Sequence, residues 1–350
     1  MFTHRKNTKP IYVGGIQIGG RDNVVIQSMT NTKTTDVDAT VRQINQLMDA
    51  GCDLVRLAVP TMAAAECFGE IRKKCNVPLV ADIHFNHSIA LKCIEVGADK
   101  IRINPGNIGS EEGVMKVAQA AKERNVPIRI GVNSGSMSKT AIEKYGNTAQ
   151  AMVESAFEHI RLLNRYDFDD IAISLKASDV VRTVDAYRLM SEKCNYPLHV
   201  GVTEAGTLMG GRMKSAVGIG ALLLDGIGDT IRVSLTADPV EEIYAAKDIL
   251  SITGLRSEGV EFVSCPSCGR CNIDLISVAT EVEERLKNVD KNIKVAVMGC
   301  AVNGPGEAKD ADVGIAGGDG CGLIFRKGEI IRKVSEDTLV DELMKEIELL

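Results

Sequence analysis

Eight short apolar segments, separated by stretches with helical spacing, are the feature that most constrains the fold of this 350-residue chain. Most of the segments show the alternation of a β-strand, and the stretches between them carry their apolar residues on one helix face. Strands that alternate with helices indicate βαβ units and a parallel sheet. Eight evenly spaced units predict an α/β fold with a (β/α)8 TIM barrel, with a doubly wound open sheet as the alternative. The segments are residues 23–30, 54–60, 78–84, 100–106, 127–133, 170–176, 197–204 and 230–236.

The stretch at residues 36–51 is typical of the expected helices. Asp36 is suited to cap its start and Gly51 to end it. The apolar stripe between them consists of Val37, Val41, Ile44, Leu47 and Met48. A further helix with Pro239 in its first turn follows the eighth segment, and the polar residues 255–261 are the expected linker.

Beyond the linker the pattern changes, and five of the ten cysteines crowd into the last quarter of the chain. An amphipathic helix, a strand, a glycine-rich loop, a second short strand, a hairpin and a final helix predict a small α+β domain there. We therefore expect two domains, a substrate-binding barrel over residues 1–255 and a metal-binding domain over residues 262–350.

Cations occupy one phase of the barrel strands. Barrel strands alternate between helix-facing and lumen-facing positions, and the apolar set must meet the helices. The opposite phase therefore brings five cations toward the carboxyl-terminal mouth, namely Arg56, Arg102, Arg129, Lys176 and Arg232. Burying unpaired like charges costs several kcal/mol, so we expect a polyanion such as a diphosphate to neutralise them with bidentate contacts. The alternative is that these side chains sit at strand ends and pair with loop carboxylates.

Further polar residues share that mouth. Asp82 and Glu204 could each offset one cation, and Glu204 lies at the rim, where barrel enzymes concentrate catalytic residues. Its alternative is a loop carboxylate paired with an arginine. His84 is expected to contact substrate or to be structural; a metal site with His87 is disfavoured because no further ligand stands at suitable spacing. Asn104 and Asn133 suit hydroxyl or phosphate contacts, or the capping of a loop.

A second chemical signal lies in the cysteines of residues 262–350. They are Cys265, Cys268 and Cys271 in "CPSCGRC", followed by Cys300 and Cys321. Zinc is one interpretation, because C-P-x-C-G is a common half of a zinc ribbon, although a ribbon needs a second C-x-x-C pair. An iron–sulfur cluster is the other, if three thiolates hold three irons and Glu307 in "NGPGE" gives the fourth iron a weaker ligand. An iron without a thiolate could exchange ligands with a substrate oxygen.

Composition excludes several functions. The net charge of −6 and the aromatic content of 4% argue against a nucleic-acid partner. No apolar run approaches the ~18 residues of a membrane span, and the basic N-terminus lacks the apolar region of a secretory signal. We therefore expect a cytoplasmic protein with reduced thiols. Two alternative functions are a pterin- or phosphosugar-binding barrel with structural zinc, and a zinc-stabilised scaffold without activity.

These motifs together resemble the bacterial 4-hydroxy-3-methylbut-2-enyl diphosphate synthase family. "VADIHFN", "KIRINPGN" and "VGVTEAG" in the barrel precede "CPSCGR" and "VMGCAVNGPGEA", so the resemblance covers nearly the whole chain. It implies that 2-C-methyl-D-erythritol 2,4-cyclodiphosphate is opened reductively, with two electrons and loss of water, to an allylic diphosphate. It also implies a [4Fe-4S] cluster, flavodoxin or ferredoxin as electron donor, and a homodimer in which the cluster domain of one subunit covers the barrel mouth of the other.

The resemblance also implies roles for individual residues. The cluster ligands would be Cys265, Cys268, Cys300 and Glu307. The catalytic residues would be Glu307, Glu204 and Asp82. The substrate would lie on Arg56, His84, Arg102, Asn104, Arg129, Asn133, Lys176, Arg232 and Ser234. One departure is Cys271, where the family more often has a residue other than cysteine.

Overall fold

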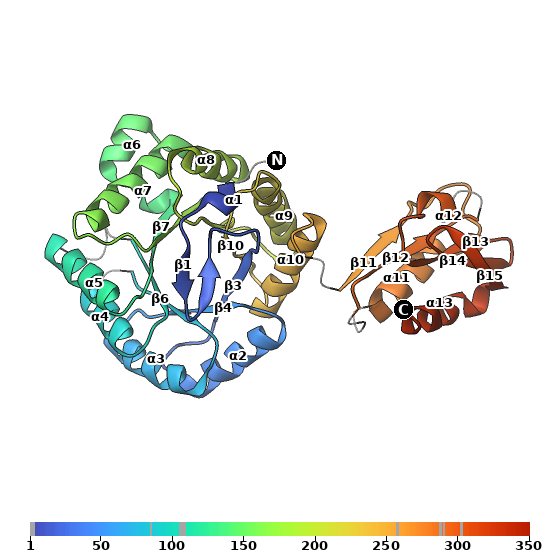
Figure 1. Ribbon diagram of the computed structural model, residues 1–350, viewed down its shortest axis with the longest axis horizontal. Helices are drawn as coiled ribbons and strands as arrows, with labels where there is room; N and C mark the ends of the chain where they lie inside the picture. The colour runs from blue at the N-terminus through green and yellow to red at the C-terminus, as the bar shows by residue number, and fades with distance from the viewer. Residues whose placement is uncertain are drawn as a thin grey trace. The chain divides into compact units, whose positions relative to one another are not determined.

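The chain divides into two compact units, Met1–Arg256 and Ser257–Leu350. The computed structural model describes residues 4–84, 86–104, 110–256, 259–286, 289, 291–301 and 304–350. The first unit runs from blue to gold in Figure 1, and the second is orange to red. Residues 257 and 258 of the expected linker lie outside the described residues. Across the described ranges, no helix is both long and apolar enough to cross a membrane.

The first unit is an eight-stranded parallel barrel, as the eight apolar segments predicted. The strands pair in the order β8-β7-β6-β5-β4-β3-β10-β9, and a parallel bridge between Ile173 and Leu198 joins the two ends of this order. The barrel strands are β3 (Val25–Met29), β4 (Leu54–Ala58), β5 (Leu79–Asp82), β6 (Lys100–Ile103), β7 (Ile128–Asn133), β8 (Ile171–Lys176), β9 (His199–Val200) and β10 (Thr230–Ile231).

The last two strands are shorter than the sequence indicated. β10 ends at Ile231, so Arg232 lies just beyond the strand and not in its middle. Only Thr230 and Ile231 pair with both neighbouring strands, while Arg232 keeps a single backbone bond to the carbonyl of Val200. The alternation nevertheless continues past the strand, because Val233 is buried in the core on the helix side.

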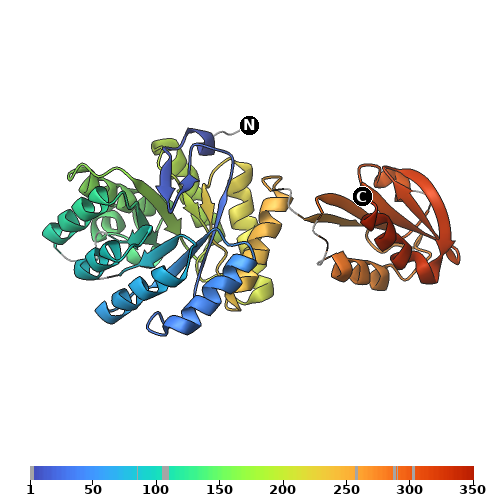
Figure 2. The same ribbon diagram turned by 60° about the horizontal axis from the view of Figure 1, so that its bottom comes forward.

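Helices cover the outside of the barrel, as Figure 2 shows. Asp36 caps the first of them by accepting a hydrogen bond from the amide of Ala39, and Pro239 opens the last, both as predicted. Met48, which the sequence analysis places on the apolar stripe of this helix, is 38% exposed. The helices are α2 (Val37–Asp49), α3 (Met62–Lys74), α4 (His87–Glu95), α5 (Glu111–Glu123), α6 (Lys139–Tyr145), α7 (Ala149–Asn164), α8 (Val180–Lys193), α9 (Leu208–Leu224) and α10 (Pro239–Ile252).

An N-terminal hairpin, which the sequence analysis missed, closes the amino-terminal end of the barrel. It follows the short helix α1 (His4–Asn7) and consists of β1 (Ile11–Val13) and β2 (Ile16–Ile18). Its apolar side chains form one cluster with residues at the starts of four barrel strands. The cluster contains Ile11, Val13, Ile18, Val25, Leu54, Val80 and Ala172. This cluster blocks the lumen below the charged residues.

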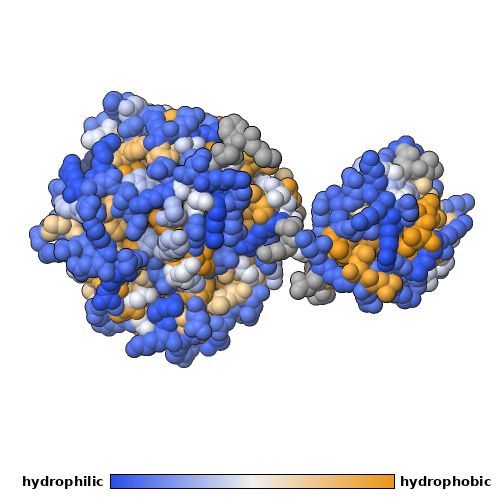
Figure 3. Space-filling model, viewed as in Figure 1, coloured by the Kyte–Doolittle hydropathy of each residue, from blue (hydrophilic) through white to orange (hydrophobic). Residues whose placement is uncertain are grey.

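The second unit contains a mixed five-stranded sheet in the order β11-β12-β13-β14-β15. The first three strands are parallel and the last two are added antiparallel, which includes the expected hairpin. Hydrophilic residues cover much of the face of each unit seen in Figure 3. The elements are β11 (Val260–Ser264), α11 (Leu275–Leu286), β12 (Ile293–Met298), α12 (Gly304–Glu307), β13 (Val313–Gly318), β14 (Cys321–Arg326), β15 (Glu329–Ser335) and α13 (Leu339–Glu348).

Candidate functional site

The carboxyl-terminal half of the barrel lumen is lined by cationic and polar side chains around a cavity of about 60 Å³. They alternate with apolar residues that face the helices, as the phase of the strands predicted. The lining residues are Arg56, Arg102, Arg129, Asn133, Ser174, Lys176, Thr203, Arg232 and Ser234. The five expected cations therefore converge, and none of them is directed into bulk solvent.

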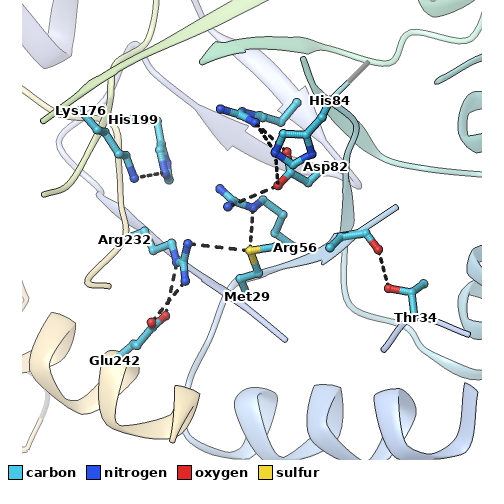
Figure 4. A network of polar contacts seen from close by, with 11 residues as sticks. Met29, Thr34, Arg56, Asp82, His84, Lys176, His199, Arg232 and Glu242 are labelled. Carbon is cyan, nitrogen blue, oxygen red and sulfur yellow. Dashed lines mark hydrogen bonds and ion pairs between the residues drawn. The ribbon is translucent and has the colours of Figure 1, made fainter. Parts of the chain in front are cut away.

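Asp82, at the end of β5, is the central counter-charge of this cavity (Figure 4). Its carboxylate lies 3.1 Å from Arg102 Nη1 and 3.5 Å from Arg56 Nη2. Burial alone would raise the pKa of Asp82, but Arg56 and Arg102 outweigh it and hold that pKa at about 2. Burial lowers the pKa of Arg56 to about 10 against the opposing effect of Asp82. Asp82 is therefore a fixed anion that orients two guanidinium groups.

Arg232 is oriented by a second buried carboxylate. Glu242 on α10 accepts from Arg232 at 3.2 and 3.3 Å, and also from Ser28 Oγ at 2.7 Å and the amide of Leu235 at 3.1 Å. On the other side, the sulfur of Met29 lies between Arg232 and Arg56. Glu204, which was expected to offset one of the cations, contacts none of them in the described part of the chain. Glu242 is the carboxylate that supplies this charge.

Arg129 is the most completely buried of the five cations, with 1% of its surface exposed. Its Nε and Nη1 have no hydrogen-bond partner among the described residues. Burial lowers the pKa of Arg129, and the neighbouring Arg56 and Arg102 act in the same direction. An unpartnered buried guanidinium is costly unless an anion completes its hydrogen bonds. Arg129 is therefore the strongest local indication of an anion site.

A glycine makes room for a second guanidinium beside Arg129. A Cβ atom at Gly131 on β7 would lie only 2.5 Å from Nε of Arg102. Any side chain at position 131 would therefore displace Arg102 from Asp82.

Two more basic residues lie deeper in the lumen. Lys100, two positions before Arg102 on β6, is 1% exposed, and His199 on β9 is completely buried. Nζ of Lys176 lies 3.1 Å from Nε2 of His199. Burial, reinforced by Arg129, lowers the pKa values of Lys100, Lys176 and His199. The lumen thus contains more basic groups than the two carboxylates can neutralise.

In the second unit, two cysteines follow adjacent parallel strands. Cys265 comes directly after β11, and Cys300 comes shortly after β12. The sulfur of Cys265 accepts a hydrogen bond from the amide of Gly299 at 3.1 Å. Because β11 and β12 are adjacent and parallel, these two cysteines, which are 35 positions apart in sequence, reach the same edge of the sheet.

Arg270 interacts electrostatically with three of the expected cluster ligands, Cys268, Cys300 and Glu307. Hydrogen bonds from its backbone and side chain lower the pKa of the exposed Cys268 thiol. The pKa of Arg270 is raised chiefly by Cys268, with further contributions from Cys300 and Glu307. Thiolate is the form that binds metal, so a low pKa at Cys268 favours ligation.

The donor chemistry of this edge fits an iron–sulfur cluster, since soft thiolates and one carboxylate are present. Within the described residues, no three Cys, His, Asp or Glu side chains are close enough to hold a single metal ion. Cys271 donates its thiol to the carbonyl of Ile273 at 3.2 Å and packs against the core of the second unit. Cys321 begins β14 and lies close to Gly318.

Comparison with known proteins decides the family. Residues 8–247 match the GcpE TIM-barrel domain, and residues 261–349 match the GcpE protein C-terminal domain. The chain belongs to the GcpE family. Relatives named 4-hydroxy-3-methylbut-2-en-1-yl diphosphate synthase (flavodoxin) include proteins of Shouchella clausii, 60% identical over 99% of this chain and 95% of that protein, and Clostridium perfringens, 62% identical over 99% of both.

Solved structures show the same barrel fold in other enzymes. A dihydropteroate synthase from Yersinia pestis superimposes with a TM-score of 0.51 at 13% identity, over 71% of this chain and 99% of that one. A type I 3-dehydroquinate dehydratase from Clostridium difficile gives a TM-score of 0.53 at 14% identity, over 71% of this chain and 97% of that one. At such low identity the likeness concerns the fold of the GcpE barrel alone.

The other expected site residues of this GcpE chain lie at the rim of the cavity. His84 is half exposed, and its Nε2 lies 3.2 Å from Nη1 of Arg102. Asn104 donates to the carbonyl of Ser136 at 3.3 Å. Glu204 is exposed, and its backbone φ of +52° falls in the left-handed region that non-glycine residues seldom adopt. Such backbone strain clusters at functional sites.

Several residues of the GcpE barrel site were missed from the sequence. Lys100 and His199 occupy the same lumen-facing phase as the predicted cations, one step nearer the amino-terminal end of their strands. Following the lumen-facing positions two residues further toward the start of each strand would have found both residues. Glu242 stands on a helix that follows the eighth strand, and its orientation toward Arg232 has no comparable signal in the sequence.

Proposed function

We propose that this chain is a 4-hydroxy-3-methylbut-2-en-1-yl diphosphate synthase that binds a cyclic diphosphate in the barrel mouth. The substrate would be 2-C-methyl-D-erythritol 2,4-cyclodiphosphate, which takes up two electrons and two protons, loses one water and leaves 4-hydroxy-3-methylbut-2-enyl diphosphate. The observation that carries this proposal is the buried, unpartnered guanidinium of Arg129 among four further cations. The names of the relatives give the same reaction product.

The cations would bind and orient the diphosphate. Guanidinium groups offer paired N–H donors that match phosphate oxygens, and Asp82 and Glu242 hold three of the guanidiniums in place. Asn133 and Ser234 line the same cavity and can donate to phosphate or hydroxyl oxygens. The diphosphate stays bound while its ring bond to carbon breaks, because the departing oxygen remains on the cations.

The rim residues would act on the carbon skeleton. Glu204, with its strained backbone, and His84, beside Arg102, are placed to contact the part of the substrate that projects from the cavity. Asn104 would support that contact from the neighbouring strand. Asp82 acts by orienting two arginines, since its low pKa makes it a poor proton donor.

Cys265, Cys268, Cys300 and Glu307 would hold a [4Fe-4S] cluster. The cluster would supply electrons one at a time, and flavodoxin, as the relatives' names indicate, would deliver them. The exposed Cys268 with its lowered pKa and the nearby Glu307 support this assignment. Cys271 would be a bystander, because its thiol is bonded to the backbone and packed against apolar side chains.

The assignment is tested by anaerobic turnover of the cyclodiphosphate with reduced flavodoxin. We expect product from the wild-type protein. Arg129→Met should raise KM at least ~100-fold, so that it shows little activity at substrate concentrations near the wild-type KM. Arg124→Met changes an exposed cation directly after α5 and is the matched control. It should leave KM and kcat unchanged. A brown protein with iron and sulfide supports the cluster, whereas a colourless protein with zinc contradicts it.

We also propose that two chains form a homodimer in the reducing cytoplasm. None of the ten cysteines, all of which lie in the described part of the chain, forms a disulfide, which suits that compartment. Substrate and electron source must meet, so the cluster domain of one subunit would cover the barrel of its partner. Mixing inactive Arg129→Met with inactive Cys300→Ala should then restore part of the activity. Absence of any recovery in a mixed dimer shown to form by mass would contradict this arrangement.

A further inference from the structure

Three side chains form a hydrogen-bonded row across neighbouring strands on the floor of the cation cavity. Nζ of Lys176, at the end of β8, lies 3.1 Å from Nε2 of His199 on β9. Nδ1 of the same ring lies 2.7 Å from Oγ1 of Thr230 on β10. Lys176 lines the cavity, while His199 and Thr230 lie beneath it. The row therefore connects the floor of the anion site to the interior of the barrel.

The row is held by the backbone around it. His199 and Thr230 are direct partners in the parallel register of β9 and β10. Tyr187 on α8 donates its hydroxyl to the carbonyl of His199 and accepts from the amide of Leu175, which ties β8 to β9. The imidazole is completely buried, so its ring has no freedom to turn away from Lys176.

A glycine opens the path that Lys176 follows. A Cβ atom at Gly201 would lie 2.8 Å from Nζ of Lys176 and 2.4 Å from the carbonyl oxygen of Arg232. Lys176 therefore passes over the place that a side chain at position 201, the residue directly after β9, would fill, and reaches His199. This route places the amine against the imidazole.

The hydrogen bond between two basic nitrogens needs one donor and one acceptor. When Nδ1 carries the ring proton and donates to Thr230, Nε2 is the acceptor for an N–H of Lys176. Burial lowers the pKa of Lys176, and four arginines around it lower it further. The charged and titratable groups that face the pair are Arg56, Asp82, His84, Lys100, Arg102, Arg129, Tyr187, Arg232 and Glu242. An additional positive charge is unfavourable here until an anion enters.

We propose that His199 is a positioning residue, which holds Lys176 so that its amine takes up a proton when the diphosphate binds. This inference rests on the proposed function, because it needs a doubly charged anion in the cavity. The proton comes from solvent and adds to the lone pair of Nζ. The resulting ammonium donates to Nε2 of His199 and to a phosphate oxygen. No other bond forms or breaks, and no electron moves.

The proposal predicts a pH-dependent affinity that arginines cannot produce. Guanidinium groups stay charged near neutral pH, so an arginine-only site binds equally at pH 7 and 8.5. Uptake of one proton on binding makes the dissociation constant rise by up to about tenfold for each pH unit. Each phosphorus of a cyclic diphosphate carries one strongly acidic oxygen, so the ligand itself does not titrate in this range.

The first experiment measures binding of the cyclodiphosphate to the full, cluster-loaded protein without reductant, by calorimetry in two buffers of different ionisation enthalpy. We expect the wild type to take up a proton and to weaken between pH 7 and 8.5. Lys176→Met should bind more weakly and show neither effect. A wild-type affinity that is constant over this range, or an unchanged slope in Lys176→Met, would overturn the proposal.

The second experiment separates positioning from folding. His199→Gln keeps an acceptor toward Nζ, whereas His199→Leu removes it at similar size. We expect His199→Leu to raise KM about tenfold with a smaller change in kcat, and His199→Gln to recover much of the loss and the pH slope. Equal KM values and slopes for both variants and the wild type would refute a positioning role. If His199→Leu does not fold, a pH slope in His199→Gln unlike the wild-type slope refutes it equally.

The outcomes also separate this inference from the proposed function. Binding that is tight but independent of pH overturns the role of Lys176 and His199 and leaves the diphosphate site intact. Absence of binding by the wild type at every pH overturns both.

Discussion

The guanidinium of Arg102 occupies the space that a side chain at position 131 would fill, because residue 131 is a glycine. Nε of Arg102 would be 2.5 Å from a Cβ at that position, while its Nη1 lies 3.1 Å from Asp82. We therefore expect Gly131→Ala to push Arg102 away from the cavity. Loss of a charge-assisted hydrogen bond to the anion should raise KM for the cyclodiphosphate about 10- to 100-fold. Steady-state kinetics measure this.

Gly135→Ala is the matched control, since nothing lies within 4 Å of a Cβ there. It should leave KM unchanged. A normal KM in Gly131→Ala, with the protein folded, would show that Arg102 does not depend on this space.

Glu242→Gln should destabilise the barrel. Glu242 is 4% exposed and accepts hydrogen bonds from Arg232, Ser28 and the amide of Leu235. A neutral glutamine at this position would leave Arg232 as an uncompensated charge in the barrel. We expect the free energy of unfolding to fall by about 3 kcal/mol, measured by urea denaturation. Glu241→Gln, whose ion pair with Arg212 is over a third exposed, should cost less than about 1 kcal/mol. Equal losses for the two variants would contradict this assignment.

The buried Asp229 should make stability depend on pH. Burial raises its pKa to about 6, although it accepts from the amide of Leu198 and from Thr8. A folded-state pKa above the ordinary value of 3.8 stabilises the protein fully below pH 3.8, and this contribution is lost as the pH rises through about 6. The shift amounts to about 3 kcal/mol.

Denaturation of wild type and Asp229→Asn at pH 4.5 and 7 measures this contribution. As the pH rises from 4.5 to 7, the wild type should lose stability relative to Asp229→Asn, so its unfolding free energy minus that of the variant should decrease. A difference that is the same at both pH values would show that Asp229 does not titrate between them.

The cysteine assignments predict unequal effects on metal content. Cys265→Ala, Cys268→Ala and Cys300→Ala should each lose most iron and sulfide after anaerobic reconstitution. Cys271→Ala should keep both, because its thiol is bonded to the carbonyl of Ile273. Iron and sulfide assays with visible absorption measure this. Loss of the cluster in Cys271→Ala alone would assign the fourth ligand to that cysteine.

Alternation along the strands made the cation cavity predictable. Ile101 and Ile103 must face the helices, so Arg102 had to face the lumen, and the same argument held for Arg232 although its strand ends one residue earlier. Glu242 could not be found this way. It adjoins Glu241 on a helix, and only the packing of α10 decides which of the two carboxylates turns inward.

The N-terminal hairpin was missed although a signal was present. Gly14 and Gly15, with φ of +52° and +85°, form the two-residue turn between the alternating strands "IYV" and "IQI". A Gly-Gly pair between such runs is a hairpin signal. The positions of the thiols in the second unit had no such signal, since they depend on the register between β11 and β12.

The apolar cluster of β1 and β2 has a kinetic consequence. Because this cluster closes the amino-terminal end of the barrel, the described residues leave the carboxyl-terminal mouth as the opening of the charged lumen. Reactant and product must use the same exit in turn, and the product keeps the diphosphate that the lumen attracts. Departure of the product therefore competes directly with arrival of the next molecule, and accumulated product should inhibit the enzyme competitively.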